Sequence, residues 1–277
     1  MNDVTDFTEF KRQALARHLR QHVEGEVRFD TTTRHLYSTD ASSYQIEPLG
    51  VVLPRTIEAL HATVQIATEM RVPLTARGGG TSLSGQSIGP GLIVDCSKYL
   101  NQILAVDPAA RTARVQPGVV LDQLNRVLAA RDLQFGPDVA TATRANLGGM
   151  IGNNSAGARS IVHGKTIDHV RRLGVVLADG TRTEFGPLST ATWERKAAAR
   201  TAEGAIYRTV PQIVQEHAEE IQRRFPKILR RVSGYNLDAL LEPLAIEDRG
   251  SRIEDGKRGP STTAVDPRSS ILDPRSS

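Results

Sequence analysis

The chain has 277 residues, which is enough for one large domain or two small ones with a substantial core. Hydrophobic residues make up 39% and charged residues 24%, and 35 Lys and Arg against 31 Asp and Glu leave a net charge of +4, so nucleic-acid binding has no compositional support. Cys96 is the single cysteine, which excludes an internal disulfide framework, a four-cysteine zinc site and an iron–sulfur cluster ligated by this chain alone. Redox chemistry would therefore need an organic cofactor.

The N-terminal segment predicts an amphipathic helix, because Phe7, Phe10, Leu15 and Leu19 recur at helical spacing. Its polar start lacks the apolar stretch of a signal peptide, and no apolar run approaches the roughly 20 residues of a membrane-spanning helix. We expect a cytoplasmic protein, at most peripheral to a membrane through a partner. A mixed arm follows the helix, over residues 25–50.

The next segment predicts a βαβ unit. Residues 51–54 form a short apolar strand, Thr56 is a candidate N-cap for a helix reaching about Met70, and residues 72–76 form the next strand. Such a unit delivers the chain to a loop at the carboxyl end of a parallel strand, where ligands commonly bind.

After Leu92 the pattern becomes mainly antiparallel. A strand at 92–95 precedes a predicted hairpin of 103–106 with 112–115, and a helix runs from Val120 to Leu128. A second hairpin joins 170–178 to 181–185 through Asp179-Gly180, and residues 190–230 have a helical pattern. We expect an α+β fold with two subdomains, a small parallel βαβ unit followed by a mainly antiparallel sheet with flanking helices.

The last segment, residues 246–277, has no apolar face and contains Asp-Pro-Arg-Ser-Ser twice. This composition predicts a disordered tail. The organisation expected from the sequence is thus a helix and arm over 1–45, a folded domain over 46–240, and the tail over 246–277.

The loop at residues 77–86 is the first candidate site. Its three consecutive glycines permit positive φ and a close backbone approach to a ligand, while successive N–H groups can converge on a diphosphate. The dinucleotide fingerprint needs a helix immediately after the loop, which Ser87, Gly89 and Pro90 disfavour. A P-loop ending at Gly164-Lys165-Thr166 fails because position 159 is Arg. A long turn without a ligand remains the simplest alternative.

A second run of small residues, 146–157, follows Phe135-Gly136-Pro137-Asp138. Its glycines, Asn and Ser offer polar groups to a flat ligand, and Leu147 and Ile151 offer an apolar surface. The alternative is a tightly packed glycine-rich helix start. Either run alone is a weak signal, whereas both together in this order are specific.

Other conspicuous residues are interpreted as structural. The seven histidines show no metal-ligand spacing, so we expect no metal site. Cys96 ends an apolar strand and is interpreted as a small buried hydrophobe. The basic residues of 223–231 are interpreted as a solvated face, and Trp193 and Tyr207 as anchors of the late helices.

Through these two runs, residues 25–240 resemble the FAD-binding domain of the vanillyl-alcohol oxidase and p-cresol methylhydroxylase type. The similarity is strongest to FAD-linked D-2-hydroxyacid dehydrogenases, namely the cytochrome-type D-lactate dehydrogenase and the FAD subunit of glycolate oxidase, and it includes Arg231-Val232-Ser233-Gly234-Tyr235-Asn236-Leu237. The cofactor-binding residues that this resemblance implies are Arg77, Gly78, Gly79, Gly80, Thr81, Ser82, Gly85, Gln86, Pro137, Asp138, Asn146, Leu147, Gly148, Gly149, Gly152, Asn153, Asn154, Ser155 and Gly157.

The resemblance implies a D-2-hydroxyacid such as D-lactate or glycolate as substrate, and a separate electron acceptor, with an iron–sulfur or cytochrome partner as one option. Members with covalent flavin carry His at the position of Thr81, so non-covalent FAD is expected. The family's Gly-Ser-Glu-Gly-Thr motif and its substrate domain with the catalytic histidine have no counterpart here, so no catalytic residue is assigned. The alternatives are a truncated FAD-binding module without independent activity and a diphosphate-binding protein that binds no flavin.

Overall fold

The computed structural model describes residues 9–228 and 235–241. The described residues divide into two compact units, the first formed by 9–210 with 226–228 and 235, and the second by 211–225 with 236–241. The candidate site lies in the first unit. Three parts of the sequence-based predictions lie outside the described residues, namely Phe7, the stretch 231–234, and the tail 246–277.

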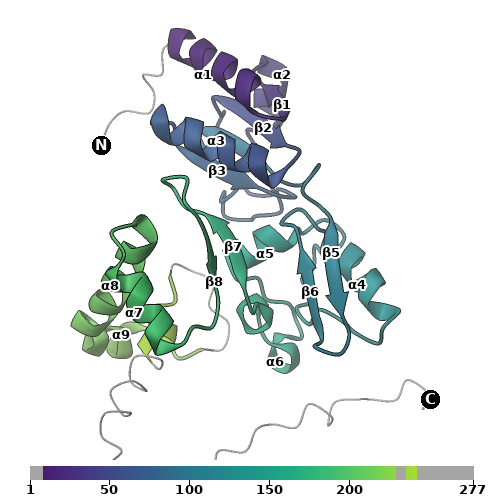
Figure 1. Cartoon of the computed structure of the whole chain (residues 1–277). Coiled ribbons are helices and arrows are strands. Elements are labelled where there is room, and N and C mark those ends of the chain that lie inside the picture. The colour runs from purple at the N-terminus through teal and green to yellow at the C-terminus, as the bar shows by residue number, and fades with distance from the viewer. Residues whose placement is uncertain (1–8, 229–234, 242–277) are drawn as a thin grey trace, which may run out of the picture. The chain divides into compact units, whose positions relative to one another are not determined.

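A four-stranded sheet forms one layer of the first unit (Figure 1). The strand order is β1-β2-β4-β3, with β2 and β3 parallel to β4 and β1 antiparallel to β2. The βαβ prediction is confirmed, with β4 inserted between the two predicted strands. Strand β1 lies in the segment that sequence reasoning left as an irregular arm. The strands are β1 (Gly25–Arg28), β2 (Gly50–Pro54), β3 (Leu74–Arg77) and β4 (Leu92–Asp95).

Two helices, α1 (Glu9–His22) and α3 (Ile57–Glu69), share one core with the sheet. Leu15 and Leu19 of α1 are fully buried in it with apolar residues of α3, β2 and β4. The predicted cap is confirmed, because the Thr56 side chain accepts from the Ala59 N–H at 3.0 Å. The placement of Phe10 on the buried face was wrong: Phe10 is 81% exposed, because the buried face of α1 is centred on Leu15 and Leu19.

The antiparallel part consists of two separate two-stranded ribbons rather than one sheet. Both predicted hairpins are confirmed, and Gly180 supplies a positive φ of 83° at the second turn. The α+β class is therefore confirmed. The ribbons are β5 (Ile103–Asp107) with β6 (Thr112–Val115), and β7 (Leu173–Val176) with β8 (Arg182–Phe185).

A second core joins helix α4 (Leu121–Ala129) to helix α5 (Leu147–Asn153) and includes Val119, Leu124 and Met150. The β7–β8 turn contacts α3, because Thr68 Oγ1 donates to the Ala178 carbonyl at 2.6 Å. The other helical segments are α2 (Thr31–Leu36), α6 (Ser160–His163), α7 (Thr190–Ala198), α8 (Ala202–Glu216), α9 (Ala218–Arg224), and the 3₁₀ turns η2 (Thr166–His169) and η3 (Leu237–Leu240).

The late helices follow the predicted pattern as far as Arg224. Trp193 of α7 meets Tyr207 of α8 edge to face, with ring centroids 4.8 Å apart, in agreement with an anchoring role. In the second unit, Arg223 and Arg224 of α9 both pair with Glu220, as expected of a solvated helix face.

Glu26 of β1 should make stability depend on pH. Lys98, Tyr99 and Arg28 all contact its carboxylate, and the hydrogen bonds from Lys98 and Tyr99 lower its pKa from 4.5 to about 2. Because the folded pKa is depressed, this stabilisation is complete above about pH 4.5 and is lost as the pH falls towards 2. We expect Glu26→Gln to cost about 1 kcal/mol at pH 7 in urea unfolding, because partly exposed pairs are worth little more.

The same measurement at about pH 3 should give a smaller difference between Glu26→Gln and the unmodified chain. Glu194→Gln, at an exposed position on α7, serves as the control. An energy gap that stays constant between the two pH values would contradict the assignment.

Candidate cofactor-binding site

The two glycine runs, far apart in sequence, meet in space. A Cβ atom built on Gly79 would lie 2.3 Å from the carbonyl oxygen of Arg144, and one built on Gly78 would lie 2.7 Å from Oδ1 of Asn146. Side chains do not tolerate contacts this short. The loop after β3 therefore reaches the second run only because both positions are glycine.

Asn146 stands at the centre of this contact and is 4% exposed. Its Nδ2 donates to the carbonyl of Gly118 at 2.6 Å. Because a carbonyl can only accept, the amide nitrogen must face Gly118 and Oδ1 must face the loop. Within the part of the chain that the structure describes, the buried Oδ1 has no hydrogen-bond donor. An unpaired buried acceptor is costly, so this oxygen is suited to a ligand donor.

The glycine loop presents a row of free donors. Among residues 9–228 and 235–241, no acceptor is found for the backbone N–H groups from Gly78 to Ser82. Gly80 has a positive φ of 65°, and no helix follows before β4, in agreement with the exclusion of the dinucleotide fingerprint. At the tip, Ser82 Oγ donates to Gln86 Oε1 at 3.0 Å, which closes the loop on itself. Such a row of N–H groups is suited to an anion.

Most of the second run forms helix α5. Its backbone therefore has the form expected under the alternative of a tightly packed, glycine-rich helix start. On one side a Cβ on Gly148 would lie 2.7 Å from Pro117, and Leu147 is buried in the second core rather than turned to a ligand. On the other side, a Cβ on Gly149 or Gly152 would meet no atom of the described residues within 4 Å. The helix thus has one packed side and one open side without side chains.

The remaining predicted residues surround the end of α5. A Cβ on Gly157 would lie 2.0 Å from Asp138 Oδ1, so this glycine lets the two segments touch. Asp138 accepts from the Arg159 Nε at 3.0 Å, and this bond lowers the pKa of Asp138. Asn153 Nδ2 donates to Ser155 Oγ at 3.0 Å, whereas the buried Nδ2 of Asn154 finds no acceptor in the described parts of the chain.

Sequence reasoning missed Gly118 and Arg144, which complete the contact. A Cβ on Gly118 would lie 2.2 Å from the carbonyl oxygen of Cys96, directly after β4. The sequence feature that could have pointed to Gly118 is the pair Pro117-Gly118 after the first hairpin. This pair is typical of an ordinary turn, so its role is visible only once its neighbours in space are known.

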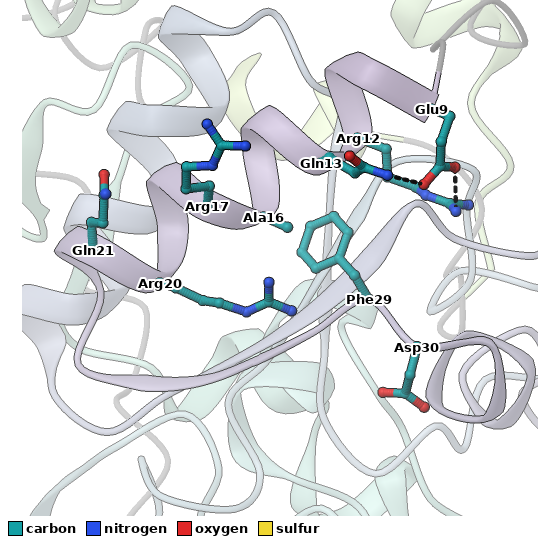
Figure 2. A pocket seen from close by; sticks show the side chains of 9 residues that line it. All are labelled: Glu9, Arg12, Gln13, Ala16, Arg17, Arg20, Gln21, Phe29 and Asp30. Atoms are coloured by element: carbon teal, nitrogen blue, oxygen red, sulfur yellow. Dashed lines mark hydrogen bonds and ion pairs between the residues drawn. The ribbon is translucent and has the colours of Figure 1, made fainter.

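A groove of about 630 Å³ lies elsewhere, between α1 and the turn that joins β1 to α2 (Figure 2). Arg12, Arg17, Arg20 and Phe29 line it, but Arg12 pairs with Glu9. None of the predicted cofactor residues belongs to this groove, so its size does not make it the candidate site.

The comparison with known sequence families decides the assignment. A family described as FAD binding domain matches residues 48–186, which is just over half of the 277 residues and includes both glycine runs. This chain belongs to the FAD-binding domain family.

Individual relatives are dehydrogenases and oxidases. The D-2-hydroxyglutarate dehydrogenase of Pseudomonas putida is 39% identical over 216 residues, covering 77% of this chain and 22% of the relative. The glycolate oxidase subunit GlcD of Bacillus subtilis is 38% identical over 162 residues, covering 57% of this chain and 34% of the relative. The chain thus spans about a fifth to a third of the length of these relatives.

Solved structures agree on the fold. Alkyldihydroxyacetonephosphate synthase superposes with a TM-score of 0.57 at 22% identity, covering 62% of this chain and 38% of that one. For p-cresol methylhydroxylase the TM-score is 0.55 at 19% identity, with 65% and 36% covered. The predicted resemblance to the FAD-binding domain of this type is confirmed. In the described residues, no helix is both long and apolar enough to span a bilayer.

The residues present fit an FAD molecule. The row of free N–H groups matches a diphosphate, the unpaired Oδ1 of Asn146 matches a ligand hydroxyl or N–H, and the open side of α5 matches a flat ring or its linker.

Alanine substitutions on the open side of α5 should have opposite effects on the stability of the protein and on FAD binding. Gly149→Ala and Gly152→Ala should each raise the stability of the apoprotein by roughly 0.5–1 kcal/mol, because alanine favours a helix and meets no neighbour. If the cofactor covers this side, the same methyl groups should weaken FAD binding about tenfold or more. Urea unfolding and FAD titration measure the two effects.

Gly174→Ala in β7 is the matched control, because its Cβ also meets no described atom within 4 Å but it belongs to neither run. Its FAD affinity should be unchanged. Full FAD affinity in both α5 variants would show that the cofactor lies elsewhere.

Proposed function

We propose that this chain binds FAD non-covalently and serves the oxidation of a D-2-hydroxyacid to the 2-oxoacid. The observation that carries the proposal is the meeting of the two glycine runs around the unpaired oxygen of Asn146. The family assignment and the names of the relatives support it.

Each part of the site has its own task in this proposal. The N–H groups of Gly78 to Ser82 bind the diphosphate, and Asn146 Oδ1 accepts a hydrogen bond from the cofactor. The open side of α5 receives the ribityl and flavin portions, with Pro137 and Asp138 beside them. When bound, FAD supplies a two-electron acceptor for the hydride of the carbon that bears the hydroxyl. The chain's own contribution is to bind and orient.

The proposed substrate class is supported by the relatives, which are named for D-2-hydroxyglutarate and glycolate. D-2-Hydroxyglutarate, D-lactate and glycolate share the hydroxyl next to a carboxylate, and each would lose one hydride and one proton. Electrons then leave to a separate acceptor protein.

A second candidate function is an FAD-binding module that does not oxidise substrate by itself. The observation that favours it is the short length of the match: the alignments cover only 22% of the D-2-hydroxyglutarate dehydrogenase and 34% of GlcD.

The visible spectrum of the purified full chain distinguishes the two. We expect bound flavin, and its absorbance should bleach when D-lactate, glycolate or D-2-hydroxyglutarate is added without oxygen. Bound flavin that stays oxidised with all three acids would favour the module. A colourless protein that takes up no added FAD would contradict both.

The threonine at position 81 leads to a test of whether FAD is bound covalently or non-covalently. Threonine offers no ring nitrogen for a flavin bond, so acid precipitation of the holoprotein should release all flavin into the supernatant. Flavin fluorescence that stays with the denatured polypeptide on a gel would overturn the non-covalent assignment.

A further inference from the structure

The glycine loop is held by a segment that precedes β2. Residues 37–44, here called the strap, cross the loop at several points. The Ala41 N–H donates to the Gly80 carbonyl at 3.0 Å, and Ser87 Oγ donates to Asp40 Oδ2 at 3.0 Å. The Tyr44 ring covers Gly85, where a Cβ would lie 2.9 Å from Cδ2. The strap thus contacts the middle and the far end of the loop.

Arg77 also connects the strap to the loop. Its guanidinium donates to the carbonyl of Thr39 at 2.9 Å and to that of Ser87 at 3.1 Å. A longer bond of 3.4 Å reaches the Tyr37 carbonyl, and the guanidinium carbon lies 5.1 Å from the centre of the Tyr37 ring. A planar fork of donors can reach several carbonyls at once, which a lysine ammonium cannot do in the same geometry.

The strap is in turn fixed to the sheet. Tyr37 donates its hydroxyl to Asp95 Oδ2 at 2.6 Å, at the end of β4. Burial and the bond to Asp95 raise the pKa of Tyr37, so the hydroxyl keeps its proton at neutral pH. The Cys96 N–H donates to the Arg77 carbonyl at 3.0 Å, which fixes the start of the loop to the same strand end.

These contacts fix two carbonyls of the segment, those of Gly80 and Ser87, while its N–H donors from Gly78 to Ser82 find no acceptor in the described residues. A loop with unrestrained carbonyls could turn them towards its own N–H groups or towards a bound anion. Fixing the carbonyls in advance reduces the ordering cost of binding.

We propose that Arg77 and Asp40 are positioning residues that hold the loop ready for the diphosphate, without contacting the cofactor themselves. This inference rests on the proposed function, and it gives Arg77 a different task from the direct contact expected from the sequence.

A purely electrostatic effect of the two charges predicts a different result for each variant. Burial pushes the pKa of Asp40 upward, but hydrogen bonds from Ser42 and Ser87 outweigh it and hold the pKa below its usual value, so the carboxylate is ionised at neutral pH. If charge alone mattered, Asp40→Ala would tighten the binding of an anion and Arg77→Lys would leave it nearly unchanged. Positioning predicts that both variants bind more weakly.

The test uses the full chain freed of flavin. FAD affinity is measured by quenching of flavin fluorescence, and ADP affinity by competition with FAD, because ADP carries the diphosphate without the flavin. We expect Arg77→Lys and Asp40→Ala to weaken both ligands by about the same factor, tenfold or more. Glu194→Ala on α7 is the carboxylate control and should match the unmodified chain. A loss of fold alone would also lower the urea unfolding midpoint, which is recorded in parallel.

Tighter binding in Asp40→Ala, or unchanged affinity in Arg77→Lys, would overturn the proposal. So would a loss for FAD that ADP does not share, because the loop would then not be the diphosphate site. If Arg77→Lys fails to fold, Asp40→Ala and Ser87→Ala carry the test. An unmodified chain that binds neither FAD nor ADP would instead overturn the proposed function.

Discussion

At the carboxyl ends of β3 and β4, glycines meet backbone atoms more closely than any side chain would permit. Gly79 adjoins the carbonyl of Arg144, and Gly118 adjoins that of Cys96. These contacts connect the sheet to the second core, whose residues come from the chain after β4. The position of Asn146, and with it the unpaired oxygen, depends on both contacts. The candidate site is therefore a product of backbone packing between two cores rather than of one motif.

The same constraint separates the roles of the glycines. Gly78, Gly79 and Gly157 are needed because a neighbour occupies the space of a side chain, whereas Gly149 and Gly152 have open space where a side chain would be. In the first group glycine is required by the packing of the chain itself. In the second group the described fold gives no reason for glycine, and the proposed binding of FAD supplies one.

Local patterns were sufficient for the parts of the fold that depend on local chemistry. Thr56 capped its helix and Asp179-Gly180 formed its turn as predicted. Strand β1 was missed because Gly-Glu-Val-Arg has little apolar character and becomes a strand only by pairing with β2. The orphan oxygen of Asn146 and the contacts of Arg77 could not be predicted, because each depends on partners about 30 or 40 residues away in the chain.

Cys96 lies at the junction of these elements, directly after β4. It is partly buried, and desolvation raises the pKa of its thiol to about 12. A thiol held in its protonated form reacts slowly with alkylating reagents. The single cysteine is thus a native probe of local opening: its rate of modification reports how often the strand end separates from its neighbours, without any label being introduced.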